Sequence, residues 1–119
     1  MPLTILHVED SRLVAETVRD ALEAEGWKVE TCADGYAALN RFASATRYDL
    51  LLLDYGLPNV NGVELAKYAR KLPRYRAAPI IMLSAESVRD EAKAAGVNLF
   101  LRKPEDMGLL VEAVRRLIG

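Results

Sequence analysis

The sequence predicts a three-layer α/β fold, in which a doubly wound parallel sheet of five strands is covered by helices on both faces. Five apolar segments alternate along the chain with five segments whose apolar residues recur at helical spacing, which is typical of βα units. Two of the apolar segments, within residues 50–54 and 79–84, lack polar alternation, as expected of strands buried on both faces. The length of 119 residues fits one domain, so residues 1–119 are expected to form a single unit with right-handed crossovers.

The first half of the chain supplies three strands and two helices. Strands are predicted at residues 3–8 and 27–32, and the partial apolar–polar alternation of the second places it nearer a sheet edge. Between them lies a helix that Asp10 or Ser11 caps and Gly26 ends. Its apolar positions recur at helical spacing: Val14, Thr17, Val18, Ala21 and Leu22. A weaker helix follows the turn at residues 34–35 and is expected to reach about residue 46, before the strand at 50–54.

The second half continues this alternation. Asn61 is the expected cap of a helix that Pro73 stops, and residues 86–95 are predicted to form a short helix ended by Gly96. The remaining strands are predicted at residues 79–84 and 97–102, and the last helix at 107–118. The first strand follows Met1 directly, which favours an amino-terminal domain, and no room for an output domain is expected after the last helix.

The composition argues against several classes of function. The formal net charge is -1, which gives no electrostatic reason to expect nucleic-acid binding. No apolar run approaches the roughly 20 residues of a membrane span, and the amino terminus lacks the pattern of a signal peptide. Cys32 is the only cysteine and cannot form an internal disulfide, so a cytoplasmic location is expected. Cys32 and the single histidine, His7, are interpreted as packing residues.

Polar residues stand at the ends of four predicted strands. Glu9 and Asp10 follow the first strand, Asp54 ends the third, Ser84 ends the fourth and Lys103 follows the fifth. Because the carboxyl ends of parallel strands lie at one edge of a sheet, these side chains are expected to converge. Three clustered carboxylates repel one another unless a cation joins them. Oxygen ligands without a second histidine or a cysteine pair favour Mg²⁺ over zinc.

The same set of residues fits phosphoryl transfer. A divalent cation, the Lys103 ammonium, the Ser84 hydroxyl and a free carboxylate are the parts of such a site. Asp54 is the expected acceptor, which would become an aspartyl phosphate. Each residue also has an ordinary structural interpretation: Asp10 as a helix cap, Glu9 and Lys103 as solvated charges, and Ser84 as a turn residue.

The motifs resemble the receiver domain of two-component response regulators over nearly the whole chain. The likeness is carried by Val8-Glu9-Asp10, Leu53-Asp54, Pro58, Asn61-Gly62, Leu83-Ser84-Ala85 and Lys103-Pro104. The resemblance implies a flavodoxin-like fold with strand order 2-1-3-4-5. It also implies a phospho-accepting signalling domain that assists its own phosphorylation and dephosphorylation and is not otherwise an enzyme.

The resemblance implies a role for each acid. Asp54 resembles the aspartate that is phosphorylated in the family. Asp10 and Asp54 resemble direct ligands of Mg²⁺, with Mn²⁺ as an alternative ion, and the backbone carbonyl of Gly56 is a further expected ligand. Glu9 resembles the acid that holds the metal through water.

Lys103 resembles the lysine that pairs with the phosphoryl group, and the peptide bond before Pro104 is expected to be cis. Ser84 matches the hydroxyl residue that moves toward the phosphoryl oxygens. Phe100 occupies the position of the switch aromatic, although plain core packing is an alternative interpretation of this side chain. Ser84 and Phe100 are therefore the expected switch residues, and Asp54, Lys103 and Ser84 the expected catalytic set.

The implied phosphodonor is a sensor histidine kinase or a histidine phosphotransfer protein. The signal is expected to pass to a downstream protein target or a lost output domain, without direct binding of nucleic acid or membrane, and dimerisation on phosphorylation is a further implication. Two departures from the family pattern stand out: Gly56, where a larger side chain is common, and the acidic pair Glu105-Asp106. One alternative is a phosphorylation-independent interaction module; another is an aspartyl phosphatase, for which the chain lacks a capping insert.

Overall fold

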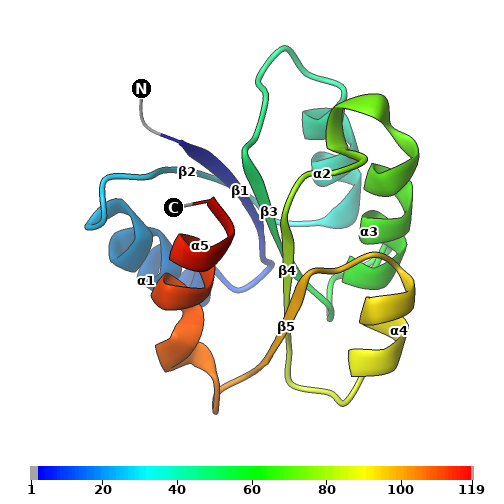
Figure 1. The fold of residues 1–119 in the computed structure, drawn as a ribbon. Coiled ribbons are helices and arrows are strands. Elements are labelled where there is room, and N and C mark those ends of the chain that lie inside the picture. The colour runs from blue at the N-terminus through cyan, green and yellow to red at the C-terminus, as the bar shows by residue number, and fades with distance from the viewer. Residues whose placement is uncertain (1–2, 119) are drawn as a thin grey trace.

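A computed structural model describes residues 3–118, which form a parallel sheet between two layers of helices (Figure 1). The strands are β1 (Thr4–Val8), β2 (Lys28–Cys32), β3 (Leu50–Asp54), β4 (Ile80–Ser84) and β5 (Leu99–Arg102). Their order is β2-β1-β3-β4-β5, and every neighbouring pair is parallel. The predicted α/β class, the strand order and the edge position of the second strand are confirmed.

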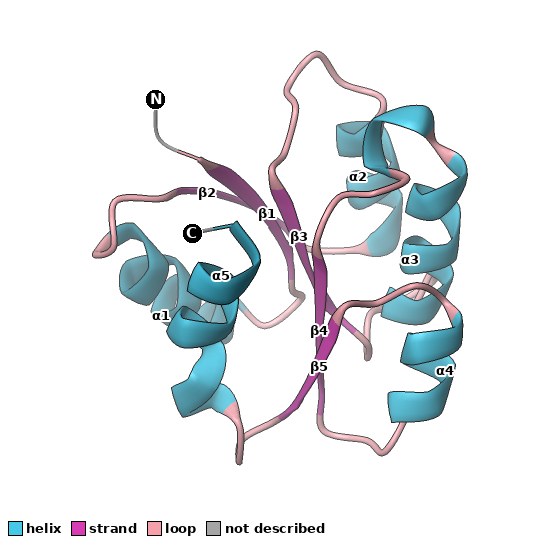
Figure 2. Ribbon diagram, in the orientation of Figure 1, coloured by secondary structure: helices cyan, strands magenta, loops and turns pink. Residues whose placement is uncertain are grey.

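Helices cover both faces of the sheet, with α1 and α5 on one side and α2, α3 and α4 on the other (Figure 2). Their bounds are α1 (Arg12–Glu23), α2 (Gly35–Phe42), α3 (Gly62–Lys71), α4 (Arg89–Ala94) and α5 (Leu110–Ile118), with 3₁₀ turns at Pro73–Tyr75 and Met107–Leu109. None of the helices within residues 3–118 has both the length and the apolar character needed to cross a bilayer.

The sheet separates two apolar cores. Leu51 and Leu53 of β3 belong to the core under α2, α3 and α4, whereas Leu50 and Leu52 belong to the core under α1 and α5. This division follows from strand geometry, because successive side chains point to opposite faces. All five residues of β3 are buried, so the run without polar alternation is a central strand, as predicted.

Side-chain caps start three helices. Ser11 Oγ accepts a hydrogen bond from the third residue beyond it at 3.3 Å, and Asp34 Oδ1 does the same for α2 at 2.8 Å. Asn61 and Glu64 form a reciprocal capping box at the start of α3. Because Ser11 caps α1, the carboxylate of Asp10 is left for another use.

Three α-helices are shorter than the sequence predicted, and in the last of them residues 107–109 form a 3₁₀ turn before α5. Helix α2 ends at Phe42 and not near residue 46, because the Ser44 hydroxyl donates to the carbonyl of residue 41 at 2.7 Å. Helix α4 begins at Arg89 and not at residue 86. There the Ser84 hydroxyl binds both backbone groups of residue 86, at 2.9 and 3.0 Å, and holds the intervening segment as a loop.

Candidate functional site

An acidic cluster lies where β1 and β3 end side by side. Carboxylate oxygens of Glu9, Asp10 and Asp54 all lie within 4.8 Å of one another. The strands bring them together because β1 and β3 are paired neighbours in register up to Val8 and Leu53. Glu9 and Asp54 are 3% and 4% exposed, whereas Asp10 lies at the surface. The predicted convergence of these three acids is found.

Lys103, which follows the edge strand β5, completes the cluster. Its Nζ lies 2.6 Å from Asp54 Oδ1 and 3.3 Å from Glu9 Oε1. The lysine follows β5 directly, and its peptide bond to Pro104 is cis, as expected. Four of the predicted site residues, separated by as many as 94 positions, therefore meet at one point.

Burial and mutual repulsion make the cluster electrostatically costly. Burial, opposed by the bond to Lys103, raises the pKa of Asp54, and the nearby carboxylate of Asp10 raises it further. Burial and the Asp54 charge likewise raise the pKa of Glu9. Burial pulls the pKa of Lys103 down, but the bonds to Asp54 and Glu9 outweigh this, so the net pKa is raised. A bound cation would offset the excess negative charge.

Two glycines shape the loop that follows Asp54. A Cβ atom on Gly62 would lie 2.5 Å from the backbone oxygen of Asp54, so a side chain there would displace the start of α3. A Cβ on Gly56 would lie 3.7 Å from Asp54 Oδ2, which is ordinary contact, so Gly56 leaves that side of the carboxylate open. The close approach at Gly62 was missed by the sequence reasoning, which named Asn61-Gly62 only as a family motif and a helix start.

Ser84 and Phe100, the two predicted switch residues, form no hydrogen bond or ion pair with the acidic cluster within residues 3–118. Ser84 is 1% exposed, and its hydroxyl is engaged by the backbone of residue 86, without a hydrogen bond to the cluster among residues 3–118. Phe100 is 8% exposed and packs in the core under α3 and α4. The guanidinium carbon of Arg89 lies 5.0 Å from the centre of the Phe100 ring.

Arg102 is a further residue that the sequence reasoning missed. Its guanidinium donates to Ser87 Oγ at 2.8 Å and to the carbonyl of Ala85 at 2.9 Å. It therefore ties the end of β5 to the loop that follows Ser84. Asp106 accepts a hydrogen bond from the Arg102 backbone N–H at 2.9 Å, which gives one of the two unusual acids a structural role. An arginine directly before Lys103 was the available sequence signal.

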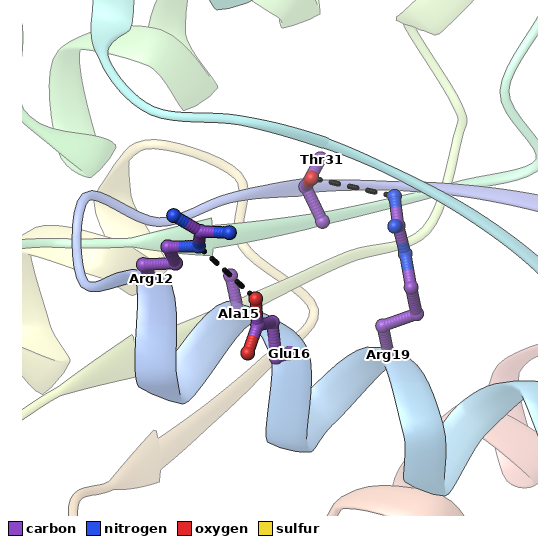
Figure 3. A pocket seen from close by; sticks show the side chains of 5 residues that line it. All are labelled: Arg12, Ala15, Glu16, Arg19 and Thr31. Carbon is purple, nitrogen blue, oxygen red and sulfur yellow. Dashed lines mark hydrogen bonds and ion pairs between the residues drawn. The ribbon is translucent and has the colours of Figure 1, made fainter.

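Two shallow hollows flank α1 beside the cluster. One, of about 170 Å³, is lined by residues of α1 and β2 (Figure 3): Arg12, Ala15, Glu16, Arg19 and Thr31. In it, Arg12 pairs with Glu16 at 3.1 Å, and Arg19 donates to Thr31 at 3.4 Å. The second, of about 290 Å³, runs from these residues to Glu9 and Asp10. Glu9 and Asp10 of the acidic cluster therefore line a hollow that opens to the surface beside α1.

His7 and Cys32 act as packing residues, as predicted. His7 is fully buried, and burial followed by the charge of Lys103 lowers its pKa to about 4, so the ring is neutral at pH 7. Cys32 packs partly buried against the core under α2, and burial raises the pKa of its thiol to about 11. Neither residue has the properties of a reactive group at neutral pH.

The fold and the site together define a class of protein. The sheet order is that of flavodoxin-like domains, and the acidic pocket with its lysine lies at the point where the order of the strands reverses. Residues 5–115 match the family model described as the response regulator receiver domain, and the chain belongs to that family. It is thus a receiver domain of the kind found in two-component response regulators.

Known relatives agree with this assignment. The chain is 29% identical over its full length to the polar-differentiation response regulator DivK of Brucella anthropi, of which it covers 98%. Chemotaxis response regulator CheY4 of Vibrio cholerae has a TM-score of 0.90 at 32% identity, with 98% of this chain and 99% of that chain covered. The receiver domain of sensor histidine kinase PA1611 from Pseudomonas aeruginosa PAO1 has a TM-score of 0.85 at 34% identity, with 100% and 99% covered, and contains a magnesium ion in its active site cleft.

Other curated relatives are longer than this chain. It spans 46 to 51% of the length of several transcriptional and response regulators that it matches at 33 to 37% identity. The shared part is the receiver domain, and the activities of those whole proteins are not carried over with it.

Proposed function

We propose that Asp54 is the phosphoryl acceptor of this receiver domain, and that a sensor histidine kinase or histidine phosphotransfer protein is the donor. The observation that carries the proposal is the convergence of three carboxylates and one ammonium where β1, β3 and β5 end. Such a cluster destabilises the fold relative to apolar packing, so a purely structural role does not account for it. Perturbed carboxylates of this kind are typical of functional sites.

The donor set of the cluster fits a hard divalent cation. The available ligands are carboxylate oxygens, which suit Mg²⁺, and Mn²⁺ accepts the same ligands. Asp10 and Asp54 would hold the ion directly with the carbonyl of Gly56, and Glu9 would hold it through water. When bound, the ion supplies positive charge that compensates the oxygens of the transferred group.

The side chains of the chain itself divide the remaining work. A carboxylate oxygen of Asp54 forms the new O–P bond while the N–P bond of the donor phosphohistidine breaks. The Lys103 ammonium, now held by Asp54 and Glu9, pairs with the incoming phosphoryl oxygens. Because Gly56 places no side chain beside Asp54, water would attack the phosphorus there as the bond to the Asp54 oxygen breaks, releasing inorganic phosphate, and the domain would so assist its own dephosphorylation.

Ser84 and Phe100 form the proposed switch. For its hydroxyl to reach the phosphoryl oxygens, Ser84 must leave its two bonds with residue 86, and the loop held by Arg102 must follow. That movement alters the packing of Phe100 under Arg89. The result would be a two-state change on the surface of α4 and β5, where a protein target or output domain reads the signal and a phosphorylated dimer could form.

The donor would dock over α1 and the segment before α5. Leu13 and Leu109 are 75% and 56% exposed, and they follow Asp10 and Lys103 in the chain by only a few residues. Contiguous apolar surface rimmed by polar residues marks interaction sites, so the proposed docking requires these two leucines to lie under the same partner. Residues 1–119 would act in the cytoplasm as one receiver domain, without contacting nucleic acid or membrane.

The test is phosphorylation by a small-molecule phosphodonor, followed by intact mass and peptide mapping. With Mg²⁺ the parent protein and the control Asp90→Asn, whose residue is exposed on α4, should gain one phosphoryl group on Asp54. Asp54→Asn should gain none, and chelation of the metal should abolish the reaction of the parent. Phosphate on the same peptide of Asp54→Asn would overturn the proposal, and a folded parent that takes up none would favour a phosphorylation-independent interaction module.

A further inference from the structure

A strongly basic cavity lies at the opposite edge of the sheet from the acidic cluster. It has a volume of about 440 Å³, and its rim carries Arg47, Arg74 and Arg76, all exposed. We call it the arginine pocket. It lies where β3 and β4 begin, at the upper end of the sheet in Figure 1. Asp54 is at the other end of β3, about 16 Å away for five residues of extended chain.

The charges of the arginine pocket are not neutralised by the fold. Within residues 3–118, no carboxylate lies within 4.0 Å of the guanidinium groups of Arg47, Arg74 or Arg76. The single acid of the lining, Asp49, already accepts a hydrogen bond from the backbone N–H of Thr4 at 2.8 Å. The lining therefore carries three positive charges and one negative charge, a net of +2, on a chain whose net charge is -1.

Part of the rim is held in position. Arg74 donates from its Nη1 to the carbonyls of Ser44 and Thr46, at 2.6 and 3.4 Å, and so fixes the segment that carries Arg47. The opposite wall is formed by the 3₁₀ turn at Pro73–Tyr75 and the residues that lead into β4. The pocket is thus formed by two segments joined by hydrogen bonds, and not by one mobile loop.

We propose that the arginine pocket binds the diphosphate group of a small phosphorylated molecule such as a nucleoside diphosphate. A guanidinium presents a planar fork of donors that matches phosphate oxygens, and a diphosphate carries enough charge to occupy three such groups. The volume is within the range of small-molecule sites, and apolar atoms of Pro73 and Ala77 can contact an organic group. A compact concave site suits a small ligand better than a polynucleotide, which needs an extended basic track.

The location gives the pocket a function separate from the phosphorylation of Asp54. A ligand there would contact the segments before β3 and β4, which lie beyond the proposed donor surface of α1 and the switch surface of α4. Binding would not compete with phosphotransfer, and the proposal stands whether or not Asp54 accepts phosphate.

The test is a titration of the ¹⁵N-labelled protein with ADP and, separately, with inorganic pyrophosphate, in EDTA so that no divalent cation links either probe to the acidic cluster. Saturable shifts of the amides of residues 47–49 and 74–78 are expected, with residues 9–10 and 54–56 unchanged. Equal binding of both probes would assign recognition to the diphosphate alone, and stronger binding of ADP would add a contact to the nucleoside.

Two double variants separate the pocket from general electrostatics. Arg47→Ala/Arg76→Ala should weaken ADP binding at least about tenfold, because two charge-assisted contacts are lost. Lys67→Ala/Arg116→Ala removes the same charge from exposed sites on α3 and α5, and should leave the affinity within about twofold of the parent. Absence of saturable shifts with either probe, or equal weakening by the two double variants, would overturn the proposal.

Discussion

Lys103→Met provides a stringent test of the electrostatics of the acidic cluster. The substitution keeps much of the apolar stem and removes the ammonium that lies 2.6 Å from Asp54 and 3.3 Å from Glu9. Removing one partner of a buried ion pair typically costs about 3–5 kcal/mol, because the other charge stays buried and uncompensated. The Lys103 side chain is 21% exposed, and Asp54 can relieve the loss by taking up a proton. We therefore expect a loss of about 2–3 kcal/mol at pH 7.5 without metal.

The assay is urea unfolding followed through the fluorescence of Trp27, the only tryptophan, in EDTA. With a urea dependence of about 2 kcal/mol per molar, the midpoint should fall by about 1–1.5 M. Lys28→Met is the matched control, because Lys28 is 62% exposed and lies 4.0 Å from Glu30, and its cost should stay below about 0.5 kcal/mol. The loss in Lys103→Met should shrink toward pH 5, as the acids become protonated. A midpoint equal to that of the parent, or a loss independent of pH, would refute this electrostatic account.

Four further predictions concern single features. The pKa values of Glu9 and Asp54 are raised, so the folded state binds more protons than the unfolded chain and the charged carboxylates destabilise the fold at neutral pH. The double variant Glu9→Gln/Asp54→Asn should therefore be more stable than the parent in metal-free urea titrations at pH 7, and this difference should diminish as the pH falls. The pKa of His7 is lowered from 6.5 to about 4, so the free energy of unfolding should fall by up to about 3 kcal/mol as the pH is lowered from 6.5 to 4. In urea unfolding, His7→Leu should make the free energy of unfolding less dependent on pH over this range. Arg70 donates to four oxygen acceptors on the α3–β4 and α4–β5 connections, so Arg70→Lys should cost about 2 kcal/mol in urea unfolding and speed amide hydrogen exchange at residues 96–98. Gly62→Ala should cost about 1–3 kcal/mol by thermal unfolding, because its Cβ would overlap the backbone oxygen of Asp54, and a neutral result would contradict the close approach of α3 to the end of β3.

The fold was predictable because its signals are local and agree with one another. The apolar run before Asp54 could only be accommodated with helices on both sides, and caps such as Asn61 marked where α3 begins. The convergence of Glu9, Asp54 and Lys103 then followed from parallel topology alone, since parallel strands bring their carboxyl ends to one edge.

The parts that sequence reasoning missed depend on side-chain bonds to the backbone, one of them local and the others between distant segments. The late start of α4 results from the hydroxyl of Ser84 binding the following loop, which competes with helix formation there. Arg70 and Arg102 look like ordinary surface charges in the sequence, yet both bind backbone carbonyls of other segments. The arginine pocket combines Arg47 with Arg74 and Arg76. Strand β3 and helix α3 lie between them in the chain, so no local sequence pattern indicates the pocket.

The alternation of side chains along the strands separates the two halves of the proposed signalling event. Asp54 and Lys103 share the parity of residues that face α1 and α5, whereas Ser84 and Phe100 share that of residues that face α3 and α4. The phosphotransfer residues and the switch residues thus lie on opposite faces of the sheet. The proposed switch connects the two faces at the carboxyl ends of the strands. A donor protein bound on the α1 and α5 face would leave the α3 and α4 face exposed. The phosphodonor and the downstream target could then bind the domain at the same time.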